Sequence, residues 1–225
     1  MVLRSTLVKL IIGIALTLIM LVGCNKDQKP SEKAFDYMEK AASQEQDFNE
    51  QQQPLVDEEK KEQDLYNKIM KLDMDDYKQI SDYSDQALAS IQKRQDMIDK
   101  EKKSIDSGYK MFKKAIPHLN DVEKDEAQKS AQAIVDIMDK RYEAFQSLYD
   151  AYQSSIDEDT KLFNLLKKKE LTTEELQTQL KVVNDSYTKV DEDKETFNKY
   201  TEEFNKNKKD FYDTVGITGS KEDKK

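Results

Sequence analysis

The sequence has few of the residues that catalytic chemistry and β-structure most often use. Its 225 residues include no tryptophan, one cysteine, one histidine, three prolines and five glycines. A single cysteine excludes a disulfide within the chain. Glycine-rich loops that bind phosphate, and the turn that presents a nucleophilic serine, are absent. With few turn glycines and no β-branched alternation, sheets are not expected either. These absences favour an all-α protein that is not an enzyme.

Charge is abundant and predominantly negative. Charged residues make up 37% of the chain, and the net charge is −9. Removing residues 1–23 would take away two positive charges and no negative ones, which leaves about −11. Non-specific nucleic-acid binding needs a basic face, so nucleic acid is excluded as a partner. Long-range repulsion from anionic headgroups and wall polymers is also expected, screened beyond about 8–10 Å.

The N-terminal segment 1–23 has the layout of a secretory signal peptide. Arg4 and Lys9 supply positive charge, and the almost wholly apolar run 10–22 ends at the small residue Gly23. That order of charge, apolar core and small residue is typical of exported proteins. The run is short for a membrane span, which needs about 20 apolar residues. An uncut transmembrane anchor remains the alternative interpretation.

The signal peptide ends in a short motif that contains the one cysteine. Leu21-Val22-Gly23-Cys24 resembles the lipobox of bacterial lipoproteins. The resemblance implies that the Cys24 sulfur receives a diacylglycerol and that cleavage leaves Cys24 as the first residue. Two acyl chains give stable membrane anchoring, whereas one is marginal. We therefore expect no cofactor besides this lipid, a cytoplasmic-membrane partner, and a position on the extracytoplasmic face.

Helical periodicity continues over most of the remaining chain. Four long segments carry apolar stripes, at about 31–71, 74–114, 121–169 and 173–215. In the last segment the stripe recurs every seven residues: Leu176, Val183, Val190, Phe197, Phe204 and Phe211. Short connections make neighbouring helices antiparallel, and a helix of about 40 residues is about 60 Å long. The prediction is an elongated antiparallel bundle, or coiled-coil hairpins, of about four long helices.

Local signals divide the chain further. After the leader we expect a lipidated N-terminus and linker over 24–31, a bundle over 32–216 and a charged tail over 217–225. Pro54 predicts a kink or break in the first helix. Asn120 with Glu123, and Thr172 with Glu175, have the spacing of capping boxes. Gly216 is a suitable stop for the last helix.

Candidate chemistry outside the leader is sparse. His118 follows Pro117 and is predicted to be an ordinary surface residue of a turn. The acidic runs 73–76 and 157–159 are interpreted as a helix start and a solvated face, and no metal site is expected, because the first run lacks the glycine and closing glutamate of a calcium loop. Most tyrosines fall on the apolar stripes, whereas Tyr37 and Tyr83 lie off them and are the better surface candidates.

The late part of the fourth segment has polar residues where its second apolar row should continue. Lys194, Thr201 and Lys208 occupy these positions. Lysine stems cover apolar surface while their ammonium groups reach water, so one interpretation is a bundle end that is open to solvent. The other is a groove for an anionic ligand or wall polymer, helped by Lys206 and Lys209.

The combination of the Leu21-Val22-Gly23-Cys24 motif with an acidic, glycine-poor, helical chain resembles the YkyA-type cell-wall-binding lipoproteins of Gram-positive bacteria. The resemblance implies anchoring outside the cytoplasmic membrane and association with the wall, and it implies no catalytic residues. The predicted function is a membrane-anchored spacer or interaction protein that contacts wall polymer or an envelope protein. A non-catalytic regulator of cell-envelope enzymes is the alternative.

Overall fold

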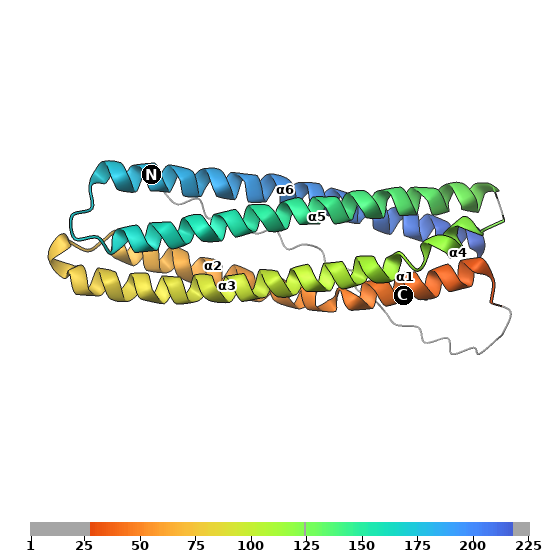
Figure 1. Ribbon diagram of the computed structural model, residues 1–225, viewed down its shortest axis with the longest axis horizontal. Coiled ribbons are helices and arrows are strands. Elements are labelled where there is room, and N and C mark those ends of the chain that lie inside the picture. The colour runs from red at the N-terminus through yellow and green to blue at the C-terminus, as the bar shows by residue number, and fades with distance from the viewer. Residues whose placement is uncertain (1–27, 124, 218–225) are drawn as a thin grey trace, which may run out of the picture.

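A computed structural model of the chain describes residues 28–123 and 125–217 (Figure 1). The leader, Cys24 and the tail from 218 onward lie outside these residues. The described part contains helices and no strand, which confirms the predicted all-α class. A single 3₁₀ turn, η1 (Met74–Asp76), precedes the third helix. The α-helices are α1 (Pro30–Gln44), α2 (Gln46–Ile69), α3 (Tyr77–Phe112), α4 (Ile116–Asn120), α5 (Asp125–Leu166) and α6 (Thr173–Val215).

The helices form two antiparallel hairpins that lie side by side (Figure 1). In one hairpin α1 and α2 together run against α3, and in the other α5 runs against α6. One end of the rod holds the start of α1, the short helix α4 and the last turns of α6. The opposite end holds the α2–α3 and α5–α6 connections. With its 43 residues, α6 spans about 65 Å, so the predicted elongated shape is observed.

The first helical segment is broken, as predicted, but the break falls at Glu45 and not near Pro54. Helix α2 runs through Pro54 without interruption. Leu55, the next residue, is buried in the core, and this packing offsets the cost of about 3 kcal/mol that a proline imposes inside a helix. At Glu45 the backbone leaves regular helical geometry, with φ −90° and ψ 9°. The carboxylate there receives two hydrogen bonds from Arg141, at 2.8 and 2.7 Å.

A polar layer divides the core of the bundle into two hydrophobic clusters. Its polar side chains are those of Glu45, Arg141 and Thr201, and Gly108 of the α3 segment lies directly against Glu45. Besides binding Glu45, Arg141 donates from Nε to the Thr201 hydroxyl at 2.9 Å. Apolar side chains precede and follow this layer on every segment, as with Ala41 and Phe48 around Glu45. The layer fixes how the four segments align along the rod, because a shifted register would leave the buried arginine unpaired.

The predicted helix boundaries are correct for α6 and wrong at the start of α5. The Thr172 hydroxyl accepts a bond from the Glu175 backbone N–H at 3.2 Å, and the Glu175 carboxylate accepts from the Thr172 N–H at 3.0 Å. Gly216 ends the helix with φ 76°, a left-handed conformation that suits glycine. Asn120, by contrast, is the last residue of α4 and caps no following helix. The first helix begins at Pro30, two residues before the predicted start of the bundle.

Candidate functional site

An open cavity lies between the first half of α1 and the short helix α4. Its volume is about 300 Å³, and Gln28, two residues before the start of α1, lines one side of it. The elements that line it, the start of α1 and α4, lie at the same end of the rod (Figure 1). Six residues line it: Gln28, Lys33, Asp36, Tyr37, Lys40 and His118.

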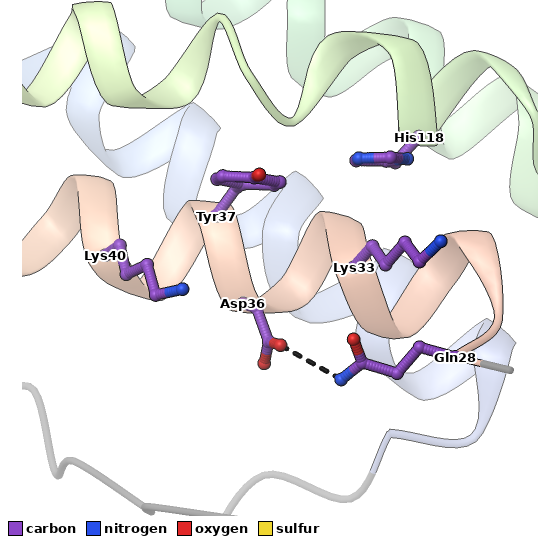
Figure 2. Close-up of a pocket in the computed structure, with 6 residues that line it drawn as sticks. All are labelled: Gln28, Lys33, Asp36, Tyr37, Lys40 and His118. Atoms are coloured by element: carbon purple, nitrogen blue, oxygen red, sulfur yellow. Dashed lines mark hydrogen bonds between the residues drawn. The ribbon is translucent and has the colours of Figure 1, made fainter. Parts of the chain in front are cut away.

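The local sequence explains how these side chains come to share one cavity. Pro30 occupies the first helical position of α1, where its missing N–H costs nothing. From there Lys33, Tyr37 and Lys40 follow at intervals of four and three residues, which places them on one face of the helix. His118 comes from α4, which is anchored by the fully buried Leu119 next to it. Figure 2 shows Lys33 and Lys40 leaving α1 on either side of Tyr37.

Two aromatic rings form one wall of the cavity. The imidazole of His118 and the ring of Tyr37 are nearly parallel, with centroids 5.6 Å apart and planes inclined by 6° (Figure 2). The Lys40 ammonium lies 5.5 Å from the centroid of the same tyrosine, a cation–π distance. Across the opening, the Gln28 amide donates to Asp36 Oδ2 at 3.0 Å. The wall is therefore ordered by contacts among the lining residues themselves.

The charges around the cavity are unbalanced in favour of cations. Within the described part of the chain, neither Lys33 nor Lys40 has a carboxylate within ion-pair distance, which sets them apart from Lys208 and Lys209. The one lining carboxylate, Asp36, already accepts a bond from Gln28. A locally positive cavity on a chain of net charge −9 is suited to a small anionic group.

The structure brings together two residues that the sequence singled out separately. Tyr37 was predicted to be a surface candidate, and it is half-buried in the cavity wall. His118 was predicted to be an ordinary surface residue of a turn, and it is half-buried in α4. Tyr83 lies on α3 instead, where Lys68 approaches its ring at 5.7 Å. The spacing of Lys33, Tyr37 and Lys40 was a sequence signal, but only the tertiary structure shows that His118 joins them.

The lysines of α6 that the sequence proposed as an anion groove are spread along the helix. Lys194 is buried and donates to Asp191 at 2.8 Å, whereas Lys208 pairs with Glu39 at 3.3 Å. These two lie fourteen residues apart, about 21 Å along the axis. Lys206 is exposed, and Lys209 pairs with Asp213 at 2.8 Å. The seam is not open to solvent at Lys194 and Thr201, which are buried. An anion-binding role for these lysines stays a prediction.

A second polar cluster, which the sequence analysis missed, lies in the core around Arg94. This arginine has no solvent exposure. Its Nη1 donates to Glu62 at 2.7 Å and to Asp159 at 2.8 Å. Asp159 belongs to the acidic run that was interpreted as a solvated face; that interpretation is wrong for Asp159, which is buried. Arg94 lies between Ile91 and Ile98 on an apolar stripe, and this placement was the available signal.

Burial in this part of the core holds several carboxyl groups closer to their neutral form. Desolvation raises the pKa of Glu62 to about 7, against the opposing attraction of Arg94. Nearby on α3, desolvation and the charge of Glu59 raise the pKa of Glu101 to about 8. Perturbed carboxyl groups are often catalytic when they face a cleft. Here Glu62 contacts the fully buried Arg94, and Glu101 contacts the amide of Gln52. We therefore interpret these carboxyl groups as structural.

Neither a membrane span nor a metal site is present among the residues that the structure describes. No helix of the folded body is long and apolar enough to cross a bilayer. Over the same residues, no group of three or more His, Cys, Asp or Glu side chains is placed to hold a metal ion. We therefore take the cavity between α1 and α4 as the candidate ligand site.

Comparison with known proteins places this helical rod in a class of envelope lipoproteins. Residues 29–214 match the model of the YkyA family, described as "Putative cell-wall binding lipoprotein". The chain is 35% identical over 198 residues to "Uncharacterized lipoprotein YkyA" of Bacillus subtilis (strain 168). The aligned region covers 88% of each of the two chains. The chain thus belongs to the YkyA family.

A solved structure supports the fold alone. A conserved protein of unknown function from Staphylococcus aureus is similar over 84% of this chain and 98% of its own, with a TM-score of 0.59. The sequence identity in this comparison is 14%, so the similarity concerns the arrangement of helices. It agrees with an elongated bundle as the architecture of the folded body.

Proposed function

We propose that the protein is a lipid-anchored rod on the extracytoplasmic face of the membrane, and that it contacts the cell wall without catalysis. The observation that carries this proposal is the family match over residues 29–214, which begins five residues after the lipobox cysteine. Cys24 would hold the diacylglycerol, with Leu21, Val22 and Gly23 as the recognition motif before it. Family membership supports the envelope location, and the lipobox supports the anchor.

The shape of the folded body fits a spacer between membrane and wall. The linker from Cys24 to Gln28 is four residues long and reaches at most about 14 Å. From that tethered end the bundle extends for about 65 Å. A rod held in this way presents its α2–α3 and α5–α6 connections far from the membrane, and this end is the one placed to reach wall polymer.

Wall contact is tested by incubating the chain from Asn25 onward with purified wall sacculi and measuring what sediments with them. We expect saturable co-sedimentation that exceeds that of an unrelated helical protein of similar negative charge. The control matters because charge repulsion acts equally on both proteins. Sedimentation no greater than that of the control would contradict wall binding and leave the anchor proposal untouched.

The anchor is tested by replacing Cys24 with alanine in the full chain. The variant should incorporate no labelled fatty acid and should keep an uncut or aberrantly cut leader, because the sulfur is the acceptor of the lipid. Metabolic labelling with a clickable fatty acid, followed by membrane fractionation, measures both. Lipid labelling at the level of the native chain would show that the assignment of Cys24 is wrong.

A further inference from the structure

We propose that the cavity between α1 and α4 binds the phosphodiester group of an anionic phospholipid headgroup. The proposal goes beyond the wall contact described above and rests on the proposed attachment of the chain to the membrane at Cys24. It would give the rod a second contact with the membrane, made by protein side chains, next to its lipid anchor.

The lining residues match the chemistry of a phosphodiester. Such a group carries one negative charge and two oxygens that bind no carbon, each able to accept hydrogen bonds. Lys33 and Lys40 each carry three N–H donors on a flexible stem, and both lack an ion-pair partner in the described part of the chain. They are seven residues apart on one face, about 10 Å along the helix, and leave α1 on either side of Tyr37, so a group bound over this face lies within reach of both flexible stems (Figure 2).

Additional donors lie between the two lysines. Tyr37 contributes a hydroxyl and His118 a ring N–H, and the two rings are held parallel by their own contact. The Gln28 amide donates to the Asp36 carboxylate, which keeps its charge, so the six lining side chains carry two ammonium groups against one carboxylate. A volume of about 300 Å³ is in the range of small-ligand sites and exceeds what one ordered water needs. A neutral sugar would leave two ammonium groups without a counter-charge.

Position favours a lipid headgroup over a wall polymer as the source of the phosphate. Gln28, a lining residue, lies at most about 14 Å of chain from Cys24. Lys33 lies in the first turn of α1, at the same end of the rod. A short tether keeps the cavity at high effective concentration relative to the headgroups. The negative charge of the remaining surface opposes this contact, but salt screens it beyond about 8–10 Å, whereas the cavity charges act at contact.

The first experiment examines the cavity without any membrane. His118 is the one histidine of the chain, so its imidazole signals in a carbon–proton NMR spectrum are unique. The probe is glycerophosphoglycerol, the soluble headgroup of phosphatidylglycerol, added to the chain from Asn25 onward. We expect a saturable shift of the His118 signals that glycerol does not cause. Lys33→Gln and Lys40→Gln should each weaken binding about five- to tenfold.

Lys60→Gln is the matched control, because Lys60 is an exposed lysine of α2 remote from the cavity. This variant should bind the headgroup as the native chain does. Circular dichroism would show whether all three variants keep their helix content. No saturable shift in the native chain, or an equal loss in the Lys60 variant, would overturn the cavity as the anion site. This result would leave the lipidation of Cys24 and the wall contact unaffected.

The second experiment distinguishes the sources of the phosphate. The chain beginning at Cys24 is coupled through its thiol to a maleimide lipid in vesicles, which reproduces the tether. An amine-acylating reagent then modifies accessible lysines, and mass spectrometry measures each one. Phosphatidylglycerol vesicles should protect Lys33 and Lys40 at least threefold relative to phosphatidylcholine vesicles, with Lys60 unchanged. Protection by soluble poly(glycerol phosphate) but not by phosphatidylglycerol would overturn the lipid assignment in favour of a wall-type polymer.

Discussion

Gly108 lies where α3 passes close to the break between α1 and α2. A Cβ atom built there would be 2.7 Å from Cγ of Glu45 and 3.2 Å from the carbonyl oxygen of Ala41. Glu45 cannot move aside easily, because both of its oxygens bind Arg141. Glycine is required at this position by the close approach of two helices and not by an unusual backbone angle.

We therefore predict that Gly108→Ala destabilises the protein by about 1–3 kcal/mol, the usual cost of overpacking. Helix propensity alone predicts the opposite sign, a gain of about 1 kcal/mol. Urea unfolding followed by circular dichroism measures the change. Ser107→Ala is the control, since Ser107 is exposed on the same turn of α3. A stabilised Gly108 variant would mean that the polar layer is less tightly packed than the structure indicates.

Glu101 makes stability depend on pH in a direction that differs from most salt-bridged carboxylates. It accepts a bond from Gln52 at 2.7 Å, and its pKa is raised from 4.5 to about 8 by burial. Between these two values the folded protein holds a proton that the unfolded chain has released. The contribution of the protonated Glu101 to the free energy of unfolding is therefore complete below about pH 4.5, and it is lost as the pH rises through 8. Glu62, with a pKa of about 7, acts in the same direction.

The expected result is a melting temperature higher by about 5 °C at pH 6 than at pH 8.5, measured by thermal unfolding at constant ionic strength. Glu101→Gln should reduce this difference, because glutamine fills the same space without a charge to desolvate. Glu143→Gln, at an exposed position of α5, should leave it intact. A melting temperature that is unchanged between these pH values in the native chain would show that Glu101 is ionised in the fold.

At the scale of single elements, α6 shows how much of a helix its own sequence can specify. Its cap at Thr172, its stop at Gly216 and its seven-residue apolar stripe were all recognisable in the sequence, and the structure has them. These signals involve residues within one or two turns of each other, so no distant contact is needed to interpret them.

Thr172→Ala removes the hydroxyl that accepts the Glu175 N–H, and we predict a loss of about 1 kcal/mol. Both residues are exposed, so the loss reports the cap and not core packing. Hydrogen exchange should speed up in the first turn of α6 while the middle of the helix keeps its protection. Thr173→Ala, one position inside the helix, is the control and should be neutral or slightly stabilising. Equal effects of the two changes would contradict the capping role.

The first helical segment shows the opposite situation. Pro54 is a strong local signal against helix, yet α2 continues through it, and the interruption falls at Glu45. Nothing within a few residues of Glu45 marks it as a break, since its partner Arg141 lies 96 positions away. Core packing overrides local preference at Pro54, and the irregular geometry at Glu45 is accompanied by contacts from distant residues, namely Arg141 and Ser104.

For the whole molecule, the arrangement of two long hairpins predicts a distinctive solution size. A compact body of the size of residues 28–217 would have a radius of gyration of about 16 Å. A rod about 65 Å long should exceed 20 Å and give a skewed distance distribution. Small-angle X-ray scattering of this body measures both quantities. A radius near the compact value would mean that the hairpins fold back in solution, which would remove the spacer role as well.

Taken as a whole, the sequence by itself determined the helical class, the four long segments, their antiparallel order and the family resemblance. These properties follow from periodicity, short connections and a contiguous motif, all of which are local in the chain. Only the tertiary structure decided the break at Glu45, the burial of Arg94 and Arg141, and the meeting of His118 with Lys33, Tyr37 and Lys40. These features bring together residues from separate helices, such as Arg94 with Glu62, 32 positions apart, and Arg141 with Glu45, 96 positions apart. The spacing of residues along the sequence does not indicate which distant residues will meet.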